Sequence, residues 1–84
     1  MEHEQPLQGM RILVVDDEFL ILICIEEALS AAGAEIVSAA TVPEALERAA
    51  DESLSAALLD VRVGVRTTEA VADELAARSV PFVF

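Results

Sequence analysis

The chain has 84 residues, of which 55% are hydrophobic and 25% are charged, as in one small globular domain rather than a disordered polypeptide. Its 16 acids and 5 arginines give a formal net charge of −11, which argues against a surface for nucleic acid or for anionic membranes. A divalent cation, or a partner that presents basic side chains, is compatible with this charge.

Residues 1–9 contain polar residues, proline and glycine without periodicity, and we expect them to form a flexible arm ahead of a domain at 10–84. The acidic start lacks the layout of a signal peptide, which favours a cytoplasmic protein. The only histidine of the chain, His3, lies in this arm, and there is no second histidine with which it could bind a metal.

A run of four branched apolar residues, 12–15, predicts a short strand that is buried on both faces. Three acids follow it directly, namely Asp16, Asp17 and Glu18. Carboxylates repel one another, and in an open α/β sheet the carboxyl ends of the strands are where ligands bind. These acids therefore mark a candidate site.

Residues 18–32 predict a helix that stops at Gly33, and residues 34–40 predict a second short strand. The helix begins with an apolar run at 19–25, which is too short to span a bilayer. Within this run, Cys24 is the only cysteine of the chain and lies between two isoleucines, so we expect a buried thiol that packs as a small hydrophobe.

A capping box predicts the start of a second helix, which extends to about residue 51. In this motif the Thr41 hydroxyl accepts the Glu44 amide hydrogen, and the Glu44 side chain reaches back to the chain before the helix. A third apolar strand at 55–61 again ends in an acid, Asp60.

After a loop that holds Gly64, Thr67 or Thr68 is expected to cap a third helix that extends to about residue 78. Residues 80–84 predict a fourth strand. The order β-α-β-α-β-α-β with short apolar strands predicts an α/β domain with a parallel sheet and right-handed crossovers.

Asp16, Asp17 and Asp60 each follow a predicted strand, and they converge at one crevice if the first and third strands are neighbours. Clustered carboxylates suit a hard cation such as Mg²⁺, which takes oxygen ligands and keeps several waters. With the metal in place, one carboxylate stays nucleophilic toward a phosphoryl group. The other interpretation is that these residues serve only in turns and helix caps.

The sequences VVDDE at 14–18, LLD at 58–60 and VPFVF at 80–84 together resemble the receiver domain of bacterial response regulators. The Pro-Phe-x-Phe of the last segment is similar to the fourth-strand motif of one subgroup, whose members are often stand-alone domains without an output domain. The resemblance implies a flavodoxin-like (CheY-like) open sheet with strand order 2-1-3-4, here lacking the fifth strand and the final helix.

By this resemblance, Asp60 is the phosphoacceptor, which attacks a phosphohistidine on a sensor histidine kinase or a histidine phosphotransferase. Asp17 binds Mg²⁺ directly and Asp16 mainly through water, and Asp60 and the backbone carbonyl of Arg62 complete the metal site. Glu18 is expected to begin the first helix rather than to bind the metal, because a negative charge suits a helix start.

The chain contains no lysine and stops at Phe84, before the positions where receivers carry a switch Thr or Ser and a Lys that offsets phosphoryl charge. We therefore expect slow or unstable phosphorylation and no ordinary switch, since a phosphoryl group adds roughly two negative charges. Arg62 and Arg66 either offset part of the negative charge of the phosphoryl group or are solvated loop arginines. The chain is either a natural truncation or a fragment of a longer receiver.

The predicted fourth strand and the apolar first helix are not covered by any other predicted element. We therefore expect a homodimer that forms through one of these surfaces. The leading function is a phosphoacceptor without an output domain, and the alternative is a degenerate receiver that acts only as an interaction or dimerisation module. An enzyme is not expected, because aspartate-nucleophile phosphatases on similar folds usually carry two acids two residues apart, whereas Asp16 and Asp17 are adjacent.

Overall fold

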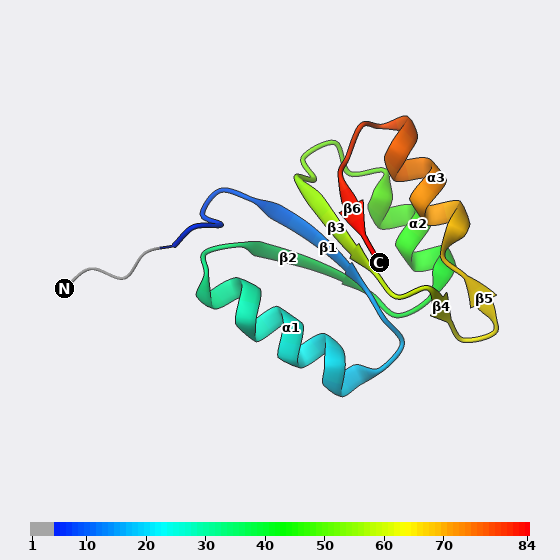
Figure 1. The fold of residues 1–84 in the computed structure, drawn as a ribbon, viewed down its shortest axis with the longest axis horizontal. Helices are drawn as coiled ribbons and strands as arrows, with labels where there is room; N and C mark the ends of the chain where they lie inside the picture. Colours follow the sequence, from blue (N-terminus) through cyan, green and yellow to red (C-terminus); the bar gives the residue numbers. More distant parts are fainter. Residues whose placement is uncertain (1–4) are drawn as a thin grey trace.

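The computed structural model describes residues 5–84, and its elements follow the chain order expected from the sequence (Figure 1). Their bounds are β1 (Arg11–Val15), α1 (Phe19–Ala31), β2 (Glu35–Ala39), α2 (Val42–Ala49), β3 (Ala56–Leu59), β4 (Arg62–Val63), β5 (Arg66–Thr67), α3 (Glu69–Ala77) and β6 (Phe82–Val83). The short strands β4 and β5 were not expected. All other elements lie where the sequence places them, with ends that differ by a few residues.

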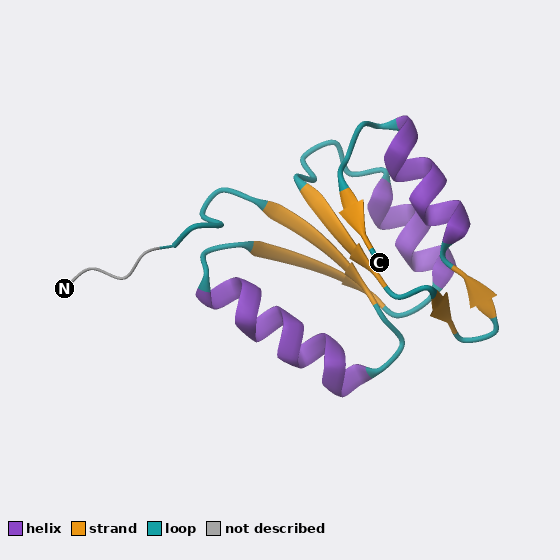
Figure 2. Ribbon diagram, viewed as in Figure 1, coloured by secondary structure: helices purple, strands orange, loops and turns teal. Residues whose placement is uncertain are grey.

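The large sheet is parallel and has the order β2-β1-β3-β6, which confirms the predicted fold class and strand order. The helix α1 covers one face of this sheet, and α2 and α3 lie on the other (Figure 2). None of the helices in residues 5–84 combines the length and the apolar character that crossing a membrane requires.

The strand β1 is the centre of the core, because its branched side chains alternate between the two faces of the sheet. Ile12 and Val14 pack with Leu22 of α1 on one face. Leu13 and Val15 pack with residues of α2 and α3 on the other face. The four apolar residues of β1, at 12–15, are at most 5% exposed, which confirms the prediction of a strand buried on both faces.

A capping arrangement determines where α2 begins. The Thr41 hydroxyl accepts a hydrogen bond from the Glu44 N–H at 3.2 Å, as the capping box predicts. The Glu44 carboxylate reaches back and accepts from the N–H of Ala40 at 2.8 Å, one residue earlier than in the usual form of the motif. Pro43 occupies the first turn of the helix, where its missing N–H has no helical partner to lose.

The thiol of Cys24 is exposed, so the prediction of a buried thiol is wrong. The reason is that α1 rests on the sheet with one side only, and Leu22 is its only buried residue. Cys24 lies two positions further along, which turns its side chain about 200° around the helix axis. Phe19 and Leu20 are 72% and 73% exposed, so the start of α1 presents an uncovered apolar surface.

Residues 5–10, most of which we expected in a flexible arm, form a turn that packs against the end of α1. The N–H of Leu7 donates to the Ala32 carbonyl at 2.8 Å, and the N–H of Met10 donates to the Leu7 carbonyl at 3.0 Å. Leu7 and Met10 are partly buried against the core on the α1 side of the sheet. Residues 1–4, which include His3, lie outside the described part of the chain.

The helices α1 and α3 end in the same backbone motif, in which two N–H groups beyond the helix donate back to its last turn. The motif requires a residue with positive φ just after the helix cap. After α1 this residue is Gly33, with φ of 102°, whereas after α3 it is Ser79, with φ of 60°. A serine in this conformation is strained, because its Cβ approaches the backbone.

We expect Ser79→Gly to raise the free energy of unfolding by about 0.5–1 kcal/mol, since the relief of the strain exceeds the entropy that glycine gains in the unfolded chain. Ser79→Ala should not raise it, because alanine keeps the Cβ. Urea denaturation of the three proteins measures the difference. A glycine variant no more stable than the alanine variant would contradict the expected strain.

Candidate functional site

The carboxyl ends of β1 and β3 lie side by side at one edge of the sheet. Val15 of β1 is in register with Leu59 of β3. The residues that follow them, Asp16 and Asp60, are therefore side by side at the ends of the two strands. The N–H of Asp60 donates to the Val15 carbonyl at 2.9 Å, and this hydrogen bond holds the two strand ends together. One carboxylate oxygen from each of Asp16, Asp17 and Asp60 lies within 4.8 Å of the others, and we call these three residues the acid cluster.

Two carboxylates of the acid cluster accept hydrogen bonds from backbone N–H groups. Asp16 Oδ1 accepts from the N–H of Glu18 at 2.9 Å, a local turn contact at the start of α1. Asp17 Oδ2 accepts from the N–H of Gly64 at 2.8 Å, across a long separation in sequence. Each hydrogen bond involves one carboxylate oxygen, so the second oxygen of the same carboxylate is available to bind a metal ion. Turn chemistry and metal binding are therefore compatible roles for these residues.

The segment after Asp60 is an antiparallel hairpin of β4 and β5 rather than the plain loop expected around Gly64 (Figure 1). Gly64 and Val65 form its two-residue turn, and Gly64 has φ of 65°, which favours glycine. Val65 at the tip is 99% exposed. The signal for this hairpin was present in the sequence, because short runs of valine and arginine flank a central glycine.

Thr68 is a site residue that the sequence did not reveal. It is the N-cap residue of α3, but its side chain makes no capping bond, so the expected side-chain cap is wrong. The residue is 0% exposed, and its Oγ1 donates to the Asp60 carbonyl at 2.6 Å, with the Val61 carbonyl at 3.3 Å. Thr68 therefore ties the start of α3 to the backbone of Asp60.

Two hollows adjoin the acid cluster. One, of about 110 Å³, is lined by Asp16, Asp60 and apolar residues of β1, β3 and α1. The other, of about 210 Å³, lies between the β4–β5 hairpin and the start of α2, and its lining includes Asp17 and Arg66. Both are smaller than the roughly 300–1,000 Å³ of typical small-molecule sites, and they suit a group the size of a hydrated ion or a phosphoryl group.

The donor atoms of the acid cluster fit Mg²⁺, which prefers carboxylate oxygens and completes its octahedron with water. Asp16, Asp17 and Asp60 are the residues that would hold the ion. Arg62, whose carbonyl is the further predicted ligand, lies in β4 two residues after Asp60, and its role as a ligand stays a prediction. Glu18 is the N-cap residue of α1, where the sequence places it.

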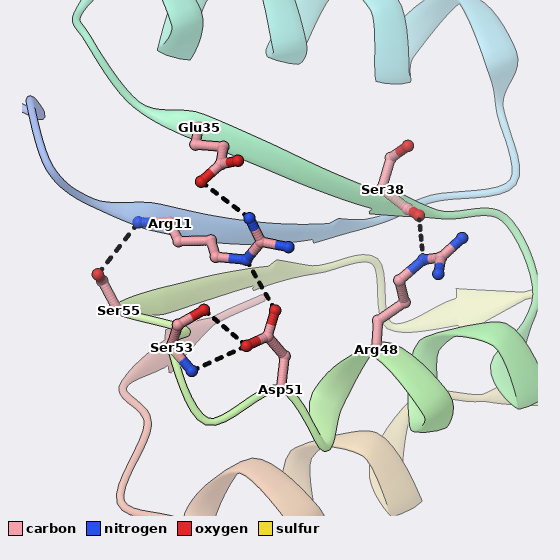
Figure 3. A network of polar contacts seen from close by, with 7 residues as sticks. All are labelled: Arg11, Glu35, Ser38, Arg48, Asp51, Ser53 and Ser55. Atoms are coloured by element: carbon pink, nitrogen blue, oxygen red, sulfur yellow. Dashed lines mark hydrogen bonds and ion pairs between the residues drawn. The ribbon is translucent and has the colours of Figure 1, made fainter.

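A separate polar network lies at the opposite end of the sheet, where β1 begins (Figure 3). The Arg11 guanidinium contacts Glu35 at 2.8 Å and Asp51 at 2.7 Å. The other oxygen of Asp51 accepts from the N–H and the hydroxyl of Ser53 at 2.8 Å and 2.6 Å. Ser55 accepts from the Arg11 N–H at 3.1 Å. These contacts join β1, β2 and the segment between α2 and β3, so the network is structural.

Hydrogen bonds from Ser53, together with Arg11, lower the pKa of Asp51 from 3.8 to about 2. Ionised Asp51 therefore stabilises the fold above pH 3.8, and this contribution is lost as the pH falls toward about 2. We expect the difference in unfolding free energy between the parent and Asp51→Asn to shrink over the same interval. Urea denaturation at several pH values tests this, with Glu52→Gln at an exposed neighbouring position as the control. A difference that stays constant throughout would contradict the expectation.

No family model matches the sequence, and no curated protein is similar enough to be counted as a relative. Solved structures do match. The crystal structure of the response regulator PhyR from Brucella abortus is 28% identical with a TM-score of 0.80, over 90% of this chain and 32% of that one. The solution structure of the BeF3-activated conformation of SdrG from Pseudomonas melonis Fr1 is 41% identical with a TM-score of 0.73, over 92% of this chain and 67% of that one. The present chain thus spans about a third of the PhyR chain and about two thirds of the SdrG chain.

Proposed function

This chain belongs to the receiver-domain family of response regulators, and from that premise we propose that Asp60 accepts a phosphoryl group in a Mg²⁺-dependent reaction. The donor is a phosphohistidine on a sensor histidine kinase or a histidine phosphotransferase. The observation that carries the proposal is the acid cluster, in which oxygens of Asp16, Asp17 and Asp60 lie within 4.8 Å of one another.

In the proposed reaction, a carboxylate oxygen of Asp60 attacks the phosphorus atom, a P–O bond forms, and the P–N bond to the donor imidazole breaks with its electron pair leaving on the nitrogen. Mg²⁺, when bound, offsets the negative charge of the phosphoryl oxygens. Asp17 would hold the ion directly and Asp16 mainly through water, and Asp60 and the Arg62 carbonyl would be further ligands. The bond from Thr68 to the Asp60 carbonyl holds the backbone of the acceptor in place.

A small phosphoryl donor, phosphoramidate, tests this reaction without knowledge of the natural partner. We expect the mass spectrum of the intact protein to show one added phosphoryl group when Mg²⁺ is present and none when the metal is chelated. Asp60→Asn should abolish the addition, whereas Asp73→Asn, at an exposed position of α3, should leave it unchanged. Equal labelling of the Asp60→Asn variant would refute the proposed acceptor.

A second candidate function, an interaction or dimerisation module, is favoured by the apolar residues that remain uncovered. Val83 of β6 is 57% exposed, and residues of β3 and β6 line a hollow of about 150 Å³. Within residues 5–84, β6 pairs only with β3, so its outer edge has no partner strand. Such an edge pairs readily with another chain, and a second copy of this chain would present the same edge.

Sedimentation at high micromolar concentration distinguishes the two routes to a homodimer. We expect a dimer that Val83→Lys disrupts if the copies pair through β6, or that Leu20→Lys disrupts if they pack through α1. A monomeric parent protein at the highest concentration would exclude the homodimer and leave the phosphoacceptor function untouched.

A further inference from the structure

The arginines of the β4–β5 hairpin differ from the other cations of the chain. Arg11, Arg48 and Arg78 each form an ion pair with a glutamate or aspartate. Arg62 and Arg66 form none with any carboxylate in residues 5–84. In a chain of net charge −11, two arginines that follow the proposed phosphoacceptor within six residues, and that lack a carboxylate partner in residues 5–84, are available for an anion.

The pairing of the hairpin strands separates these two arginines. Residues directly opposite each other in an antiparallel pair have side chains on the same face. Arg66 is opposite Val63, which is 4% exposed and packs into the core, so Arg66, although exposed, shares the hairpin face of Val63. Arg62 is opposite the exposed Thr67, on the other face.

Two further observations place the hairpin face of Val63 and Arg66 beside Asp17 of the acid cluster. The Gly64 N–H donates to Asp17 Oδ2 at 2.8 Å, which anchors the turn to the end of β1. Arg66 and Asp17 line the same hollow of about 210 Å³. Arg66 is therefore near Asp17 of the proposed metal site, yet it forms no ion pair with a carboxylate in residues 5–84.

We propose that Arg66 is the cation that binds the phosphoryl oxygens on phosphorylated Asp60, whereas Arg62 is not. This inference rests on the proposed function above. When the acyl phosphate forms, Asp60 loses its own charge and the phosphoryl group brings roughly two negative charges beside Asp16 and Asp17. A guanidinium has a planar set of donors that binds two phosphoryl oxygens at once, so it suits this task.

The test uses beryllium fluoride with Mg²⁺ as a stable mimic of the phosphoryl group, with affinity measured by titration under NMR observation. We expect Arg66→Gln to weaken beryllium fluoride binding by about tenfold or more, as for the loss of a charge-assisted bidentate contact. Arg78→Gln, at the exposed C-cap of α3, is the control and should change it by less than about twofold. Arg66→Lys should fall between the parent and Arg66→Gln, because it keeps the charge but not the planar set of donors.

The affinity for Mg²⁺ alone supplies a readout that a merely structural role would not produce. Removing a cation near Asp17 reduces repulsion of Mg²⁺, so Arg66→Gln should bind the metal alone as tightly as the parent or more tightly, while it binds beryllium fluoride more weakly. If Arg66→Gln weakens both affinities together, or weakens neither, the assignment of Arg66 is overturned and the phosphoacceptor function stands. If the parent itself does not bind beryllium fluoride, the proposed function fails, and this inference fails with it.

Discussion

Asp17→Asn should weaken Mg²⁺ binding by about tenfold or more, because the variant loses a charged oxygen ligand of the acid cluster. At a Mg²⁺ concentration one hundred times the Kd of the parent, the ion should raise the unfolding free energy of the parent by about 2.7 kcal/mol and that of the variant by about 1.4 kcal/mol or less. Urea denaturation with and without Mg²⁺ measures both values.

The same substitution should have the opposite effect when Mg²⁺ is absent. Asp17→Asn removes one of three carboxylates that lie within 4.8 Å, while the amide oxygen still accepts from the Gly64 N–H. We expect the metal-free variant to be more stable than the parent by about 0.5 kcal/mol. Asp17→Ala is the control, because it loses the charge and the hairpin contact together. A parent whose stability does not respond to Mg²⁺ would contradict the metal site.

Thr68→Val should lower the free energy of unfolding by about 1–3 kcal/mol. Valine has nearly the same shape but cannot donate, so the short hydrogen bond to the Asp60 carbonyl is lost inside a fully buried position. For a domain of this size, each kcal/mol lowers Tm by roughly 4–8 °C, which calorimetry measures readily.

Thr68→Ser and Thr67→Val separate the hydrogen bond from other effects. The serine keeps the hydroxyl and should be more stable than the valine variant, despite the lost methyl group. Thr67 is exposed, so Thr67→Val should change the unfolding free energy by no more than about 0.5 kcal/mol. We also expect Thr68→Val to weaken Mg²⁺ binding, because the bond holds the backbone of Asp60. Equal stability of the parent and the valine variant would show that the hydroxyl contributes nothing.

The order of the main elements could be predicted because each depends on a local pattern. The residues of β1 are branched and continuous, so the strand must be buried on both faces. Asp16 and Asp60 end two such strands, and parallel strands place their carboxyl ends at one edge. The capping box of Thr41 and Glu44 is likewise a contact between residues three positions apart. Of these features, only the meeting of Asp16 with Asp60 also requires a long-range contact, namely the pairing of β1 with β3.

Other features depend on where distant segments meet. Cys24 has apolar neighbours on both sides, yet it is exposed because α1 contacts the sheet with one side only. The hydroxyl of Thr68 donates to Asp60 rather than capping α3, since the Asp60 carbonyl lies within its reach. The bond from Gly64 to Asp17 exists only because the hairpin returns to the end of β1.

By itself, then, the amino-acid sequence determined the α/β order, the buried central strand and the three aspartates, since hydrophobic period and helix caps act between near neighbours in the chain. Only the tertiary structure decided which groups lie beside those aspartates: the Thr68 hydroxyl, the Gly64 N–H and Arg66, which lines a hollow with Asp17. The physical reason is that such contacts depend on the packing of separate elements, which local spacing does not encode.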